Sequence, residues 1–150
     1  MASFSATVGA WAEKVPNALE AVFKEAAQEL VSQMDQLLAD MVYDAPPAAS
    51  GYKRTGFLRA SLMASTTAMP QLTRDNPGVS VPADLGDVVL VINGADLGDT
   101  IFLGYTANYA AFVAFGANGA PPRPWVNLVA QRWVQIVDET AARVKQRLGL

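Results

Sequence analysis

The sequence predicts an α+β fold in which long N- and C-terminal helices pack on a small, mainly antiparallel sheet. Residues 15–43 and 124–147 each repeat apolar side chains every three or four positions, which is the spacing of one helix face. Between these runs, short apolar segments are bounded by glycine, proline and aspartate, as strands and turns are. With 150 residues, 51% of them apolar, the chain can bury a core, and we expect a single domain over residues 1–150.

The first long helix is predicted over residues 15–43. Pro16 suits its first turn, because the missing N–H of proline is not needed there. Residues 1–14 are expected either to extend this helix or to form a flexible arm. The apolar stripe that should face the core consists of Val15, Leu19, Val22, Ala26, Leu30, Met34, Leu37 and Met41.

The segment after this helix is expected to contain short elements. A loop over residues 45–50 holds two prolines and should end the helix. Thr55 can cap a short helix that runs to Ser61, and residues 62–69 are expected to form a strand. Residues 71–83 show little periodicity, so we expect a mobile loop there.

A short internal repeat follows the loop. Residues 83–87, Ala-Asp-Leu-Gly-Asp, recur at residues 95–99, and each copy precedes an apolar run, at residues 88–92 and 101–103. This pattern predicts a turn and a strand, twice, and hence two neighbouring antiparallel strands. The aspartate spacing is not that of a calcium-binding EF-hand loop, so we favour turns over a metal site.

The most distinctive stretch runs from residue 105 to residue 125. Gly116 should end a short helix, a pair of prolines at 121–122 should keep the chain extended, and Pro124 should start the last helix. Without other information this is a core helix followed by a proline-rich connector. The aromatic residues whose spacing predicts one face of the short helix are Tyr105, Tyr109, Phe112 and Phe115.

The last helix is predicted as one element over residues 124–147. Basic residues near its end complement the helix dipole. Trp125 and Trp133 are four residues apart, and we expect both to pack in the core against the first helix. The complete buried stripe is predicted to be Trp125, Val129, Trp133, Ile136, Thr140 and Val144.

Composition removes several classes of function. The chain has no cysteine and no histidine, which excludes thiolate zinc sites, cysteine nucleophiles and imidazole bases. It has no phosphate-binding glycine loop and no serine-centred elbow, so we expect no enzymatic activity, no cofactor and no metal site. Residues 100–122 carry no charge, but asparagine, glycine and proline interrupt them. We expect this segment to be buried in protein and expect no membrane partner.

The net charge of −3 conceals four alternating blocks. Residues 1–44 sum to −5, residues 45–74 to +4, residues 75–116 to −5 and residues 117–150 to +3. Such blocks favour contact between unlike surfaces, either within a subunit or between copies, although solvated faces explain them equally well. The acidic balance disfavours tight binding of nucleic acid.

Three segments stand out by their order and spacing. They are residues 55–61, Thr-Gly-Phe-Leu-Arg-Ala-Ser; the segment that carries Tyr105, Tyr109, Phe112, Phe115 and Gly116; and Arg123-Pro124-Trp125. In this order they resemble the tail-completion or head-tail joining (neck) protein family of long-tailed bacteriophages. The resemblance spans about residues 15–145. One departure is Ala114, where the family usually has a glutamate before Phe-Gly.

The resemblance implies a structural virion protein rather than an enzyme. It implies a homo-oligomer, a hexameric ring, between the head-closure (stopper) protein and the tail terminator or tail tube protein. Phage DNA would pass through the ring without sequence-specific binding, and the ring would be assembled in the host cytoplasm. The alternatives are a tail-terminator ring that caps the tail tube, or a non-viral oligomeric binding protein.

Candidate subunit-interface residues come from the resembling segments and the basic block before them. Arg59 and Arg123 are expected to make the ring contact, because a guanidinium can hold a carboxylate through two hydrogen bonds. The competing interpretation is that both arginines brace loops within one subunit. The full set is Arg54, Arg59, Tyr105, Tyr109, Phe112, Phe115, Arg123 and Trp125.

Overall fold

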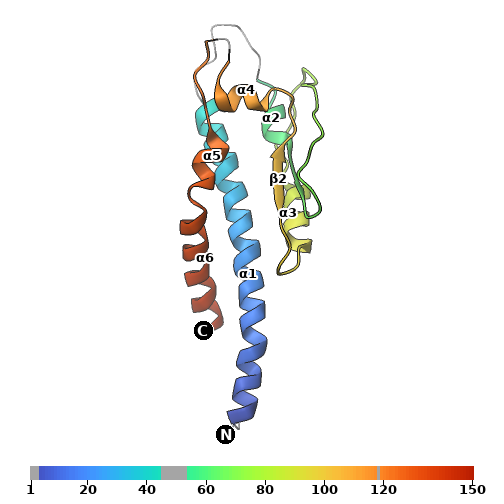
Figure 1. The fold of residues 1–150 in the computed structure, drawn as a ribbon. Helices are drawn as coiled ribbons and strands as arrows, with labels where there is room; N and C mark the ends of the chain where they lie inside the picture. The colour runs from blue at the N-terminus through green and yellow to red at the C-terminus, as the bar shows by residue number, and fades with distance from the viewer. Residues whose placement is uncertain (1–3, 45–53, 118) are drawn as a thin grey trace.

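The computed structural model describes residues 4–44, 54–117 and 119–150, and it confirms the α+β class (Figure 1). A long first helix runs through the molecule, with the C-terminal helices along one side and the small sheet and a short helix along the other. The elements in chain order are α1 (Phe4–Leu38), the π-helical turn η1 (Ala39–Tyr43), α2 (Phe57–Ala60), β1 (Leu62–Ser65), α3 (Gly86–Gly94), β2 (Phe102–Tyr105), α4 (Ala110–Phe115), α5 (Trp125–Ala130) and α6 (Trp133–Leu148).

The long first helix is confirmed, and it begins earlier than residue 15. α1 has 35 residues and starts at Phe4, so the segment before residue 15 extends the helix. Residues 39–43 continue it as the π-helical turn. The predicted loop over residues 45–50 lies outside the described residues.

The core lies between α1 and the elements on both of its sides. Val31 and Leu38 of α1 are buried, as are Leu58 of α2, Ile92 of α3 and Val129 of α5. Helix α6 runs antiparallel to α1, because Arg147 near its end pairs with Glu25 while Arg132 before its start donates to Gln33. The fold is therefore assembled around α1.

The prediction of one uninterrupted last helix is wrong. The chain forms α5 and α6, separated by a tight turn in which the N–H of Arg132 donates to the carbonyl of Val129 at 2.9 Å. Ile136, Thr140 and Val144 of α6 are nevertheless buried, so the predicted stripe is confirmed at every position except Trp133. Trp133 is the first residue after the turn and is 37% exposed, whereas Trp125 is 1% exposed.

The sheet has two antiparallel strands, β1 and β2. Leu62 pairs with Tyr105 and Ser65 pairs with Phe102, so the predicted strand over residues 62–69 ends at Ser65. The Oγ of Ser65 accepts a hydrogen bond from the N–H of Thr67 and so supports a turn directly after the strand. The predicted strand at 101–103 is confirmed as β2, displaced by one or two residues.

The prediction of a strand at residues 88–92 is wrong, because this run lies in helix α3. Val88 and Ile92 are four residues apart and almost fully buried, whereas Leu90 is 70% exposed, which is a helical pattern of burial. The side chain of Asp84 accepts the N–H of Gly86 at 2.8 Å and so satisfies a backbone donor at the start of the helix. Packing against α1 and β1 has overridden the strand preference of valine and isoleucine.

The second copy of the repeat is the predicted turn. The N–H of Asp99 donates to the carbonyl of Asp96 at 3.0 Å, and the N–H of Asp96 donates to the Asp99 carboxylate at 2.8 Å. The Asp99 side chain therefore bonds the backbone of the turn, as turn aspartates do.

Residues 71–83 form an irregular segment that is attached to the body at two points. Arg74 makes an isolated parallel bridge with Ala107, and the N–H of Val81 donates to the carbonyl of Thr55 at 2.7 Å. The mobility expected for this segment stays a prediction. Among the described ranges, no helix combines the length and apolar character needed to cross a bilayer.

Candidate functional site

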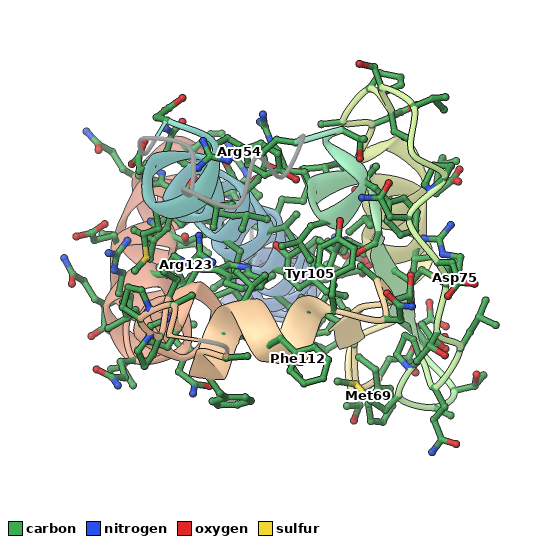
Figure 2. The ribbon with its side chains drawn as sticks, turned by 90° about the horizontal axis from the view of Figure 1, so that it is seen from above. Arg54, Met69, Asp75, Tyr105, Phe112 and Arg123 are labelled. Atoms are coloured by element: carbon green, nitrogen blue, oxygen red, sulfur yellow. The ribbon has the colours of Figure 1, made fainter. Side chains whose placement is uncertain are left out.

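The three segments that carry the family resemblance meet at one end of the molecule. Thr106, which follows β2, donates to the carbonyl of Ser61 through its N–H at 3.0 Å and through its hydroxyl at 2.7 Å. The N–H of Arg123 donates to the carbonyl of Val113 in α4 at 3.1 Å. Segments far apart in the sequence thus form one unit around the C-terminal end of α1 (Figure 2).

The first of these segments forms a tight turn before α2. Gly56 adopts a φ of +84° and stands at the N-cap of α2, a position that we had assigned to Thr55. The Thr55 hydroxyl still accepts the N–H of Phe57, at 3.3 Å, and it also contacts the side chain of Asn76 at 3.1 Å. Thr55 therefore joins the α2 turn to the loop over residues 71–83.

Arg59 is engaged within its own chain. Its Nε donates to Oδ1 of Asp35 at 2.8 Å and its Nη2 donates to Oδ2 at 2.6 Å, so the pair is bidentate. The hydrogen bond to Asp35 raises the pKa of Arg59 above its ordinary value. Of the two interpretations offered by the sequence, the internal brace describes Arg59 in this structure, and a contact of Arg59 with a neighbouring subunit stays a prediction.

The Arg59–Asp35 pair should contribute a modest coupling energy. Arg59→Met and Asp35→Asn, alone and combined, form a double-mutant cycle that isolates the pair. The Arg59 and Asp35 side chains are 33% and 17% exposed, so we expect a coupling of about 1 kcal/mol, below that of a fully buried charged pair. Chemical denaturation of the four proteins measures it, and strictly additive effects would show that the pair does not tie α2 to α1.

Two other arginines of the basic block over residues 45–74 also form hydrogen bonds within the chain. Nη1 of Arg54 donates to the carbonyl of Tyr43 at 3.0 Å, at the end of η1. Nε of Arg74 donates to the Thr106 hydroxyl at 2.9 Å, and its guanidinium lies 5.6 Å from the centre of the Phe57 ring. Arg54 and Arg74 therefore connect elements of the same chain through hydrogen bonds and a ring contact. The net charge of residues 45–74 alone did not indicate this role.

The four aromatic residues do not share one helix face, contrary to the prediction. Tyr105 belongs to β2 and Tyr109 is the N-cap of α4, so only Phe112 and Phe115 lie within the helix. The Tyr105 ring meets the edge of the Trp125 ring at 5.1 Å between centroids, and Tyr109 lies 6.4 Å from Phe57. The tyrosines therefore face inward, whereas Phe112 and Phe115 are 63% and 68% exposed.

Burial raises the pKa of Tyr105 to about 12, because its phenolate would lose hydration. Between about pH 10 and 12 the unfolded chain releases this proton while the folded chain retains it, so stability falls as the pH rises. The total loss should be about 2–3 kcal/mol. Denaturation curves across this range measure the loss. The Tyr105→Phe variant should lack this part of the pH dependence, and an unchanged profile in the variant would contradict the assignment.

Arg123 differs from the other predicted interface arginines. Its side chain is half-buried, and within the described residues its Nε has no hydrogen-bond partner. No acidic side chain of the described chain lies within ion-pair distance of it. Arg123 thus belongs to the resembling segments, and its guanidinium forms no ion pair with the described residues.

An apolar surface without charge lies beside this cation. Residues 62–73 and 100–122 contain no charged side chain, and pairing of β1 with β2 brings them together. Figure 2 shows Phe112 and Met69 on the same side of the molecule, and Met69 is 51% exposed. We call the surface formed by α4 and Met69 the α4 surface. The sequence had indicated that residues 100–122 are buried in protein, whereas part of this segment faces outward.

A groove of about 220 Å³ opens beneath the α4 surface. Its walls come from α1, β1, β2, α4 and α5, and they are almost entirely apolar. The side chains and backbone that form it belong to Met34, Leu62, Met69, Leu103, Gly104, Tyr105, Ala110, Ala111, Ala114, Phe115, Pro124, Trp125, Val126 and Asn127. The groove is suited to an apolar side chain, and none of its lining residues is charged.

The candidate site consists of the apolar α4 surface, the groove beneath it and the adjacent Arg123. In the part of the chain that the structure describes, no three acidic side chains gather closely enough to hold a metal ion. Comparison with family models, with curated proteins and with solved structures finds no match for this chain.

Proposed function

We propose that the protein is a structural virion protein of the bacteriophage neck, forming a ring that joins the DNA-filled head to the tail. The observation that carries this proposal is the convergence of the three resembling segments into one unit. Residues 55–61, 105–116 and 123–125 are separated by long stretches of sequence, yet they are joined by hydrogen bonds and ring contacts. Three resembling segments that fold into one unit are a stronger indication than three separate motifs.

The α4 surface supports a role in assembly. Phe112, Phe115 and Met69 are exposed together on segments that have no charge. Depletion of charge with enrichment of aromatic residues and methionine is typical of the buried centre of a protein interface. Contiguous apolar surfaces are rare on soluble monomers and often mark contacts between proteins.

The proposed assembly is a closed ring of identical subunits. In a ring each subunit presents two different surfaces, and the same contact repeats until the rotation closes. Arg123, whose pairing capacity is unused, supplies one charged group, and the acidic block over residues 1–44 supplies carboxylates for it. The net charge of −3 suits a channel through which DNA passes without being held.

Deleting the gene from its phage tests the proposal. We expect DNA-filled heads and separate tails by electron microscopy, with few joined particles. A tail-terminator role predicts tails of uncontrolled length instead, because the tail tube would lack its cap. Joined, infectious particles from the deletion would contradict both virion roles and leave the non-viral binding protein as the alternative.

The charge variant Arg123→Glu connects this function to the site. We expect a folded subunit that fails to complete the deletion phage, because the carboxylate of the neighbour would meet a like charge. Lys145→Glu, a charge reversal on the exposed face of α6, is the matched control and should complement the deletion. Equal complementation by both variants would remove Arg123 from the proposed contact.

A further inference from the structure

The end of the first helix carries exposed negative charge. Asp40 and Asp44 are exposed, and neither forms an ion pair with a described residue. The neighbouring Ala39 and Val42 are buried, so Asp40 lies on the side of η1 that faces away from the core. The amide of Gln36 donates to the Asp40 carboxylate at 2.9 Å. We call Asp40 and Asp44 the acidic end of α1.

The helix dipole adds to this negative charge. The last carbonyls of a helix carry partial negative charge, and the final turn of η1 contains no basic residue. Arg54 donates to the carbonyl of Tyr43 there and lies outside ion-pair distance of both carboxylates. The two aspartates are repelled by the dipole of their own helix, so a cation from another molecule would be attracted by both the carboxylates and the helix end.

Arg123 supplies a cation at the same end of the molecule. Its N–H donates to the carbonyl of Val113 in α4 at 3.1 Å, and α4 lies at the C-terminal end of α1 (Figure 1). Figure 2 looks onto this end and labels Arg123. Its Nε is buried without a partner among the described residues, and no ion pair joins it to the acidic end of its own chain. Two groups of opposite charge therefore lie at one end of the chain without meeting.

The other carboxylates of residues 1–44 fit this arginine less well. Three of them already form ion pairs within the chain, and these are Glu20, Glu25 and Asp35. Glu29 is half-buried and accepts the side-chain amide of Gln33. Glu13 is exposed and has no ion pair among the described residues, but it lies about 40 Å from Asp40 along the helix.

A closed ring can bring Arg123 and the acidic end together. Its subunits are related by rotation alone, so groups that meet across an interface lie at the same height along the ring axis. The molecule is elongated along α1, and copies that stand side by side have the C-terminal ends of α1 at one height (Figure 1). We propose that Arg123 of one copy binds the acidic end of α1 in the next copy. The inference rests on the proposed function for the ring and names the carboxylates that its contact uses.

The contact has a direction that suits a ring. Arg123 and the acidic end belong to different surfaces, so each copy gives its arginine to one neighbour and receives an arginine from the other. A guanidinium can hold a carboxylate through two hydrogen bonds, which fixes the orientation of the two copies as well as their distance.

An exchange of charges, followed by sedimentation velocity, tests the contact. Arg123→Glu should raise the concentration at which half of the chain is assembled by about tenfold or more. Addition of Asp40→Arg or of Asp44→Arg to this variant should restore assembly toward that of the original protein. Both aspartates are exposed, so these changes leave the core intact, and circular dichroism verifies the fold.

Glu13→Arg is the matched control for the exchange. It makes the same change of charge at an exposed position of the same helix, at the opposite end of α1. Combined with Arg123→Glu it should leave assembly as weak as in the single variant. Equal restoration by Glu13→Arg would show an effect of net charge alone and would overturn the pairing.

The outcomes separate this inference from the proposed function. If the original protein sediments as a ring and neither aspartate variant restores assembly, the pairing is overturned and the ring is not. If the original and the restored proteins both sediment as dimers, the pairing is supported and the ring is contradicted. A protein that stays monomeric at all concentrations contradicts both.

Discussion

Replacing Trp125 with alanine is expected to cost about 3–5 kcal/mol of unfolding free energy. Among the described side chains Trp125 is the largest that is fully buried, at 1% exposure, and it packs against Tyr105 in a T-shaped pair while lining the groove. Its removal leaves a cavity at the centre of the three resembling segments and abolishes an aromatic pair. Denaturation with urea, followed by circular dichroism, measures the loss.

Trp133→Ala is the matched control for this prediction. The sequence assigned both tryptophans to one buried stripe, which would imply a cost of about 3–5 kcal/mol at Trp133 as well. Because the turn at residues 131–132 leaves Trp133 37% exposed, we now expect a much smaller loss there. Similar losses for the two variants would contradict the burial difference on which this argument depends.

A helix whose apolar spacing repeats over many turns could be predicted from the sequence, whereas a short apolar run could not be assigned to a helix or a strand. The stripe of α1 is repeated over many turns, so its helical spacing is unambiguous and the helix is confirmed. Residues 88–92 form an unbroken apolar run, which has the same appearance in a buried strand and in a short helix. Only contact with α1 and β1 decides that Val88 and Ile92 face inward as a helical pair.

The aromatic spacing gave a wrong prediction of one shared helix face for a related reason. Intervals of four, three and three describe a helix only where the chain is helical throughout. Tyr105 ends a strand and α4 starts after Tyr109, so the four rings diverge into an inward pair and an outward pair. The outward position of Phe112 and Phe115 could not be inferred, because an uncharged segment suits an interface as well as a core.

The candidate site was therefore predicted in part. The three segments meet in the fold, which the sequence did not predict, and their arginines have unlike surroundings. Arg59 meets Asp35 across the fold, a contact that no local pattern encodes, whereas Arg123 retains its capacity for a partner. Assigning a charge to the interior or to an interface requires knowledge of which opposite charges the fold brings near it.

Gly116→Ala is the second substitution for which we expect a large effect. Gly116 ends α4 with a φ of +84° and a ψ of 148°, a backbone region that residues other than glycine rarely adopt. A Cβ added there would lie 2.8 Å from the carbonyl oxygen of Ala120 and 3.1 Å from the nitrogen of Pro122. Both atoms belong to the backbone and cannot move aside as a flexible side chain would.

Gly98→Ala separates the two contributions. Gly98 has a φ of +99°, but a Cβ there would meet no atom within 4 Å, so this variant carries the conformational cost alone, about 1–3 kcal/mol. Gly116→Ala should lose more than this, by the energy of moving residues 120–122. Those residues lead to Arg123 and Trp125, so the same variant should weaken assembly measured by sizing. Equal losses of stability in the two alanine variants would show that the chain after α4 can shift without cost, and that Gly116 does not hold the groove and the arginine in their relative positions.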